Sequence, residues 1–500
     1  MLKVFFKKGS SAPLPRGGEL VVGAELEREL RAGAAPARRL RALRDLADRA
    51  LTTRMPEMAV KKLWACMRDA LSDSSVEARH AALALLVALA EGQAAELLVM
   101  RTVFFTHLRD THARRAPDDE PLRFKLLYTL TDSGKNIKCF EDQIGEFLLE
   151  WLPEIQSTTQ IVEFLQLITN VVKFNATYLD EEIVQGIVER ACHVCSYWPE
   201  AGGVLSALKL LEAVVSYSLL PREALPAFVA ALCRSLNLDL YSRPCWKLMR
   251  SVLGADIGHA TLQQLVRTLR AGPGAAGAAG AGVGAGAGAA AGGAGAAEAD
   301  TGLARGAVFY ISMALWGPRR VTSLHVSHLA VLPAMLKALE AGQPAVVYEV
   351  IQALQMLLAR APLELHEPAW DVVLRALRRL LDLDKSLEPA NEPIHAGVHA
   401  LLGAVEQLQE AGQYAGDAAA LLALLDHCAA DRPEASAMRV VSARAAALDA
   451  RDGGAGALAL AERYVRLEPR LAVRLHALHA LVAHVKRDRL VYGWEVVSSV

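Results

Sequence analysis

The sequence has 500 residues, and its 54 Lys and Arg nearly balance its 55 Asp and Glu, for a formal net charge of −1. This length exceeds what a single hydrophobic core usually serves, so we expect two to four domains or an array of repeats. The charge balance gives no global drive toward nucleic acid or an anionic membrane. A hydrophobic content of 53% with 22% charged residues excludes a disordered chain.

Cysteine usage and the N-terminus predict the compartment. The seven cysteines are scattered and odd in number, unlike the short, Cys-dense scaffolds of secreted proteins. The apolar stretch within Met1–Lys8 is too short for a signal peptide, and the apolar run 81–90 is well short of the roughly 20 residues of a membrane helix. We therefore expect a cytoplasmic protein without membrane insertion.

In chain order, a tail over residues 1–23 precedes a helical region over 24–270. Apolar residues recur there at helical spacing, as at Val60, Leu63, Trp64, Met67 and Leu71. No segment alternates as a strand would. Helix-breaking residues divide the pattern into segments of single-helix length, at positions that include Pro56, Pro153, Pro199, Gly202-Gly203, Pro221, Pro244 and Pro344.

Residues 271–302 are dominated by Gly and Ala, which predicts a flexible linker or insertion. The segment 272–277 matches G-x-G-x-x-G. However, it follows no strand and has Pro273 where an amide donor is needed, so we favour a linker over a dinucleotide-binding loop. A second helical region spans 303–500 and looks truncated, because Val496–Val500 is apolar rather than a polar cap.

A long succession of short amphipathic helices predicts an all-α fold, a HEAT/armadillo-like α-solenoid of stacked helix pairs. The segments 73–86 and 469–481 share a pattern in which a capped start leads into small and branched residues that let a neighbouring helix approach closely. We expect roughly 40 to 47 residues per repeat.

Motifs for catalysis, cofactor binding and metal binding are weak, so we expect no catalytic, cofactor-binding or metal-binding residues. Gly134-Lys135 departs from the phosphate-loop pattern at two positions. Cys192-His193-Val194-Cys195 has no second ligand pair, so we favour buried apolar cysteines over a zinc site. The acidic run Asp180–Glu182 fits a helix N-terminus.

A local excess of basic residues lies between Arg38 and Lys62, and it contains no aromatic residue that could stack on bases. A solvated helix face is therefore favoured over nucleic-acid binding. The basic residues are Arg38, Arg39, Arg41, Arg44, Arg49, Arg54, Lys61 and Lys62.

Several stretches resemble the N-terminal region of the tuberin family of tumour suppressors. The most specific are Pro244–Arg250, and Arg305–Phe309 followed by Met313–Gly317. Supporting stretches, among them 78–81, 172–175 and 431–434, run in the same order as in the family. The resemblance covers nearly the whole chain.

The resemblance implies a HEAT-like scaffold that binds the coiled coil of the partner protein hamartin. The tuberin family activates GTP hydrolysis by the small GTPase Rheb, and so restrains target-of-rapamycin signalling at the lysosome. Its catalytic domain is C-terminal, and nothing in this chain corresponds to it. The resemblance thus implies a non-catalytic region without cofactors, cytoplasmic and recruited to the lysosomal surface, which meets Rheb only through the missing domain.

The sequence leaves two other functions open. A karyopherin-like transport protein, or another HEAT-repeat scaffold, would share the helical pattern. A GTPase activator in its own right would need a catalytic domain.

The candidate partner-binding residues are Lys61, Ala65 and Arg68. They lie in the segment whose apolar residues, from Val60 to Leu71, are expected to form the core face of a helix. This leaves the three candidate residues in one stripe on another face. The small Ala65 would let a partner helix approach, and the two cations could meet acidic side chains that flank a coiled coil. A merely solvated stripe is the alternative, because most surface charges contribute little.

Overall fold

The computed structural model describes residues 19–271, 293–386 and 391–417, together with isolated positions between 420 and 482. Over these residues the regular structure is helical, and β pairing is limited to a single bridge between Glu19 and Arg54. The predicted all-α class is confirmed. Contacts between helices divide the chain into two compact units, Met1–Pro221 and Arg222–Val500, called unit 1 and unit 2.

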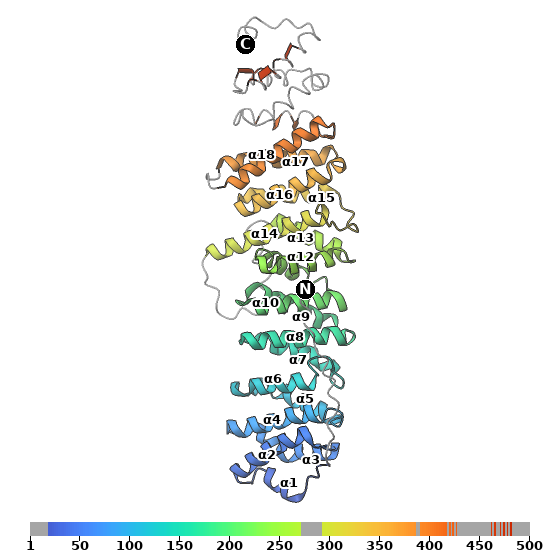
Figure 1. Ribbon diagram of the computed structural model, residues 1–500, viewed down its shortest axis with the longest axis vertical. Helices are drawn as coiled ribbons and strands as arrows, with labels where there is room; N and C mark the ends of the chain where they lie inside the picture. The colour runs from blue at the N-terminus through green and yellow to red at the C-terminus, as the bar shows by residue number, and fades with distance from the viewer. Residues whose placement is uncertain are drawn as a thin grey trace, which may run out of the picture. The chain divides into compact units, whose positions relative to one another are not determined.

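Unit 1 is a stack of helices in two layers (Figure 1). In one layer α2 packs on α4, α4 on α6, and α8 on α10, while α3 contacts α5 and α7 contacts α9 in the other layer. This stacking confirms the predicted solenoid of helix pairs. The helices are α1 (Ala24–Leu30), α2 (Pro36–Thr52), α3 (Glu57–Met67), α4 (Val76–Gly92), α5 (Val99–Asp110), α6 (Glu120–Leu130), α7 (Glu141–Trp151), α8 (Thr158–Asn175), α9 (Glu181–Tyr197) and α10 (Ala201–Tyr217).

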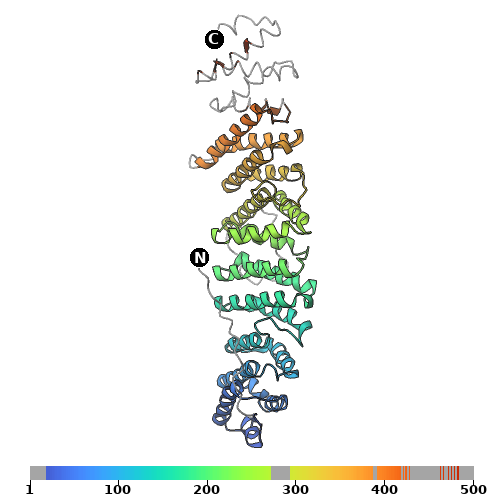
Figure 2. The same cartoon turned by 45° about the vertical axis from the view of Figure 1, so that its right-hand side comes forward.

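Unit 2 repeats this arrangement (Figure 2). One layer holds α14, α16 and α18, and the other holds α13, α15 and α17. The helices are α11 (Leu225–Ser235), α12 (Asp239–Leu253), α13 (Gly258–Ala271), α14 (Gly293–Leu315), α15 (His328–Ala338), α16 (Pro344–Arg360), α17 (Glu367–Ser386) and α18 (Glu392–Glu410).

Polar contacts between successive repeats reveal the repeat length. In unit 1 the partners are 40 residues apart for Arg79 and Asp119 and 39 apart for Arg115 and Glu154. In unit 2 Arg305 bonds to Glu349 over 44 residues. These separations agree with the expected repeat of roughly 40 to 47 residues.

Two expected helix breaks lie inside helices. Pro244 is in α12, and the carbonyl that loses its amide partner belongs to Leu240, which is 58% exposed and can bond to water instead. Gly202 and Gly203 form part of the first turn of α10. A Cβ on Gly203 would stand 2.5 Å from the Trp198 ring, so this glycine serves close packing rather than a break.

The segment 271–302 is only partly within the described residues. Helix α14 begins at Gly293, so residues 293–302 are helical rather than linker, in keeping with alanine's strong helix propensity. Residues 272–292 lie outside the described residues, as do 496–500 and most of 469–481. The proposed division into 24–270 and 303–500 stays a prediction, and α13 and α14, on either side of the segment, pack together within unit 2.

Candidate protein-interaction surface

Helix α3 has one buried face, as its apolar spacing predicted. Val60, Leu63 and Met67 are fully buried. Trp64 is half-buried, and its ring contacts Phe104 of α5 at a centroid distance of 5.4 Å. The opposite face of α3 is therefore left to solvent.

Lys61 and Ala65 lie on α3 and Arg68 directly after it, and all three are exposed. Lys61 Nζ lies 2.7 Å from Glu57 Oε1, so half of the expected cationic pair is already neutralised. No ion pair joins Arg68 to the described part of the chain. The exposure of the three residues agrees with the expectation, and their role in binding stays a prediction.

The expectation that α3 continues to Leu71 was wrong. The α-helix ends at Met67, and Arg68–Ser72 forms a 3₁₀ turn. Asp69 in this turn pairs with Arg39 of α2, with Arg39 Nη2 2.6 Å from Asp69 Oδ1. The turn thereby bonds to α2, a contact that the local pattern could not reveal.

Arg39 also corrects the interpretation of the basic cluster. Its side chain is only 8% exposed, whereas Arg38, Arg41, Arg44, Arg49, Arg54, Lys61 and Lys62 are exposed. The cluster is thus exposed except for one buried structural arginine, and it is spread over α2, the following loop and α3 rather than over one helix face.

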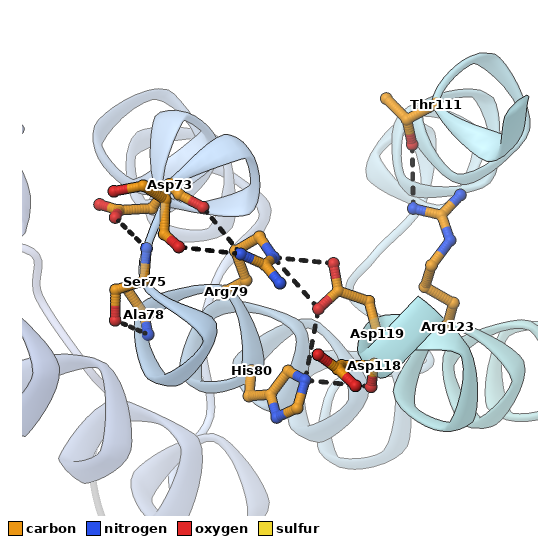
Figure 3. A network of polar contacts seen from close by, with 10 residues as sticks. Asp73, Ser75, Ala78, Arg79, His80, Thr111, Asp118, Asp119 and Arg123 are labelled. Atoms are coloured by element: carbon orange, nitrogen blue, oxygen red, sulfur yellow. Dashed lines mark hydrogen bonds and ion pairs between the residues drawn. The ribbon is translucent and has the colours of Figure 1, made fainter. Parts of the chain in front are cut away.

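A polar network beside this surface joins α4 to the next repeat (Figure 3). Arg79 Nε donates to both carboxylate oxygens of Asp119 at 2.9 and 3.1 Å, and its Nη1 donates to the Asp73 carbonyl at 3.0 Å. The hydrogen bond to Asp119 raises the pKa of Arg79. His80 Nε2 lies 3.1 Å from the carbonyl of Asp118. His80 Nε2 is also 3.3 Å from Asp119 Oδ1, so Arg79 and His80 of α4 both bond to the start of the next repeat.

A second buried arginine links α6 to α5. Arg123 of α6 donates from Nη1 to Thr111 Oγ1 at 3.0 Å and from Nη2 to the Leu108 carbonyl at 2.5 Å, both just after or within α5. Its guanidinium is almost fully buried, and this desolvation lowers the pKa of Arg123 to about 10.

The other candidate residues are structural. Cys192 and Cys195 are buried in α9, as favoured, and burial raises the pKa of the Cys192 thiol. Glu181 and Glu182 lie in the first turn of the same helix.

Within the described ranges, no three His, Cys, Asp or Glu side chains are grouped so that they could hold a metal ion. No helix there is long and apolar enough to cross a membrane.

Sequence reasoning missed an apolar part of this surface. Met58, at the start of α3, is 64% exposed, and Leu98 and Val99 at the start of α5 are each 60% exposed. The spacing of Met58 from Lys61 and Ala65 was a usable signal for its outer position. The exposure of Leu98, just before the next helix of this layer, had no such local signal.

Comparison with known proteins now identifies the family. The chain matches the family model described as "Domain of unknown function (DUF3384)" over residues 36–447. A curated "Tuberous sclerosis 2 protein homolog" from Schizosaccharomyces pombe is 21% identical over 169 residues, which cover 30% of this chain and only 13% of that protein.

Among solved structures, one described as the TSC2 N-terminus matches the fold with a TM-score of 0.62 and 17% identity. The match covers 77% of this chain and 93% of the other. The resemblance to the N-terminal region of tuberin, the tuberous sclerosis 2 protein, is thereby confirmed. Because the family model spans most of its length, the chain belongs to the DUF3384 family.

Proposed function

We propose that the chain is the non-catalytic scaffold region of a tuberin-like GTPase-activating protein and that it binds the coiled coil of hamartin. In this role it would hold the complex that activates GTP hydrolysis by Rheb, and so restrain target-of-rapamycin signalling at the lysosomal surface. The observation that carries the proposal is that the family match and the tuberin-like fold fall on the same stacked helices. Stacked repeats of this kind present extended surfaces suited to long partners.

The outer face of α3 supplies a physical basis for binding. Lys61, Ala65 and Arg68 combine cations with a small residue, and acidic side chains beside a coiled-coil seam would complement them. Each exposed pair would contribute about 0.2 to 1 kcal/mol, and more if binding excludes water.

The test is a double charge reversal, Lys61→Glu with Arg68→Glu. We expect weaker capture of a hamartin coiled-coil fragment, with a larger effect at low salt than at high salt. Unchanged capture by a folded variant would reject this site. A melting curve accompanies the assay, because a lowered melting temperature would instead indicate damage to the helix.

The non-catalytic part of the proposal has its own assay. The purified chain alone should leave the rate of GTP hydrolysis by Rheb unchanged, because it supplies no recognised group that would orient the attacking water. A clear acceleration by the pure chain would contradict this part while leaving hamartin binding open to its own test.

A further inference from the structure

The loop between α14 and α15, residues 316–327, carries two arginines that are followed closely by two hydroxyl residues. From Arg319 to Ser323 its sequence is Arg-Arg-Val-Thr-Ser. Both arginines, Thr322 and Ser323 are exposed, and none of the residues 316–327 is helical. Exposed loops on a rigid scaffold are where binding and modification residues are concentrated.

Two main-chain hydrogen bonds make Thr322 and Ser323 the tip of this loop. The Val321 amide donates to the Ala314 carbonyl of α14 at 2.7 Å, and the Leu324 amide donates to the Val321 carbonyl at 3.2 Å. Leu324 is only 8% exposed, so its side chain anchors the far side of the tip. Within the described ranges, no group forms a hydrogen bond with either tip hydroxyl. Both hydroxyls are therefore accessible to an enzyme.

The two arginines are available to a partner. Arg320 Nη1 lies 3.4 Å from Glu364 Oε1, but the two side chains are 56% and 55% exposed. An ion pair this exposed contributes only about 0.2 to 1 kcal/mol, so a competing carboxylate displaces it at little cost. Arg319 forms no ion pair with the described part of the chain. The loop thus offers two guanidinium groups just before a hydroxyl.

This arrangement suits basophilic protein kinases, which select basic substrates. Such a kinase binds arginines two and three positions before the acceptor hydroxyl with its own carboxylates, and the planar guanidinium suits these sites because it bonds to a carboxylate through two parallel hydrogen bonds. Thr322 has Arg320 at the second position before it and Arg319 at the third. Ser323 lacks an arginine at the second position, so Thr322 is the better acceptor.

We propose that Thr322 is a phosphorylation site for a basophilic protein kinase that uses MgATP. The kinase transfers the γ-phosphoryl group of ATP to Thr322 Oγ1. A bond forms between Oγ1 and the γ-phosphorus, the bond from that phosphorus to the oxygen bridging it to the β-phosphate breaks, and ADP leaves. The hydroxyl proton passes to the catalytic aspartate of the kinase. The inference goes beyond the proposed function and does not rest on it, because it involves neither hamartin nor Rheb.

The phosphate changes how this loop contacts the next repeat. Phosphothreonine carries a charge of about −1.5 to −2 at pH 7 and three strong acceptor oxygens. Arg320 lies two residues away along the chain, so the phosphate competes with Glu364 for its guanidinium. Glu364 belongs to the turn Pro362–Glu364 between α16 and α17, and its Oε2 is also 3.6 Å from His328 Nε2 at the start of α15. Phosphorylation therefore weakens a link between the α14–α15 loop and this turn.

The experiment incubates the full chain with MgATP and the catalytic subunit of the cyclic-AMP-dependent kinase, a basophilic enzyme, and locates phosphate by peptide mass spectrometry. We expect phosphate at Thr322, and its loss in Thr322→Ala. The variant Arg319→Ala with Arg320→Ala should be phosphorylated at least about tenfold more slowly, because both charges that the kinase binds are gone. Ser323→Ala is the matched control and should be phosphorylated as fast as the wild type.

Thr52 provides an internal comparison, because Arg49 lies three positions before it. Thr52 is exposed, but it is the last residue of α2, and its hydroxyl donates to the Arg49 carbonyl at 3.5 Å. A kinase binds its substrate as an extended segment, and local opening costs more in a helix than in a loop. Thr52 should therefore stay unmodified, and phosphate appearing there as fast as at Thr322 would contradict the advantage of the loop.

A synthetic peptide of residues 316–327 is assayed in parallel. Phosphorylation of the peptide but not of the folded chain would show that the loop is not accessible, and no phosphorylation of either would show that the kinase does not recognise the sequence. Phosphate at Ser323 in place of Thr322, or an unchanged rate in the double-arginine variant, would also overturn the proposal.

Hydrogen exchange tests the effect on the next repeat. Amides of residues 361–366 should exchange about 1.5- to 5-fold faster in the phosphorylated chain than in the unmodified chain, as expected for the loss of one exposed ion pair. In Glu364→Gln this pair is already absent, so phosphorylation should change the exchange there much less. An equal acceleration in the wild type and the variant would show that the phosphate does not act through Glu364.

Discussion

Arg79 of α4 and Asp119, just before α6, form an ion pair across two successive repeats, with Arg79 Nε 2.9 Å from Asp119 Oδ2. Their side chains are only 12% and 7% exposed. The same guanidinium donates a hydrogen bond to the carbonyl of Asp73, which lies just before α4 begins. The pair therefore fixes both the start of one helix and the position of the next repeat.

Replacing Arg79 with alanine should destabilise unit 1 by about 2 to 4 kcal/mol, because the buried Asp119 carboxylate loses its guanidinium partner and keeps only the contact with His80 Nε2 at 3.3 Å. Denaturant unfolding followed by circular dichroism measures this loss. Arg68→Ala, at an exposed position, is the matched control and should cost no more than about 0.5 kcal/mol. The double variant Arg79→Ala with Asp119→Ala should lose less than the sum of the two single losses; simple additivity would show that the pair is not coupled.

Gly134 should not tolerate a side chain. Its φ is +89°, and a Cβ would stand 2.3 Å from the Leu167 carbonyl oxygen of α8. We expect Gly134→Ala to lower stability by at least about 1 to 3 kcal/mol, since it adds a backbone clash to an unfavourable φ. At Gly33 a Cβ would meet no atom within 4 Å, so Gly33→Ala should be neutral or slightly stabilising. Equal melting temperatures for the two variants would contradict the close approach of this turn to α8.

His112 should make unit 1 sensitive to mild acid. Its side chain is 1% exposed, and burial, followed by the charge of Arg115, lowers the pKa of His112 to about 4, against an opposing effect of Glu154 and a smaller lowering by Arg123. A lowered histidine pKa means that the unfolded chain takes up the proton first. Stability is therefore full above about pH 6.5 and falls as pH drops toward 4, by about 2 kcal/mol between pH 7 and pH 5.

The check on His112 is a series of unfolding curves between pH 7 and pH 5 for the wild type and His112→Gln. Glutamine cannot titrate, so the variant should lose less stability over this interval even if it is weaker at pH 7. Parallel pH dependence in the two proteins would assign the acid sensitivity to other groups.

The sequence predicted features that depend on local periodicity. The buried face of α3 followed from the spacing of Val60, Leu63 and Met67, and all three are buried. The outward position of Lys61, Ala65 and Arg68 followed from the same pattern. One helix face implies the other, so these features needed no knowledge of neighbouring repeats.

Features that depend on stacking could not be predicted. The burial of Arg39 requires Asp69, which lies 30 residues away. The exposure of Leu98 and its unusual φ have no signal in the residue type. Pro244 fits inside α12 because Leu240 is exposed, which its own sequence context did not reveal.

The most direct test of the scaffold function is a calorimetric titration of the purified chain with a hamartin coiled-coil fragment, at low salt and at high salt. We expect saturable binding that weakens as salt rises, because the exposed cations Lys61 and Arg68 would meet acidic side chains of the coiled coil. The absence of binding by a chain that is fully helical by circular dichroism would contradict the scaffold function.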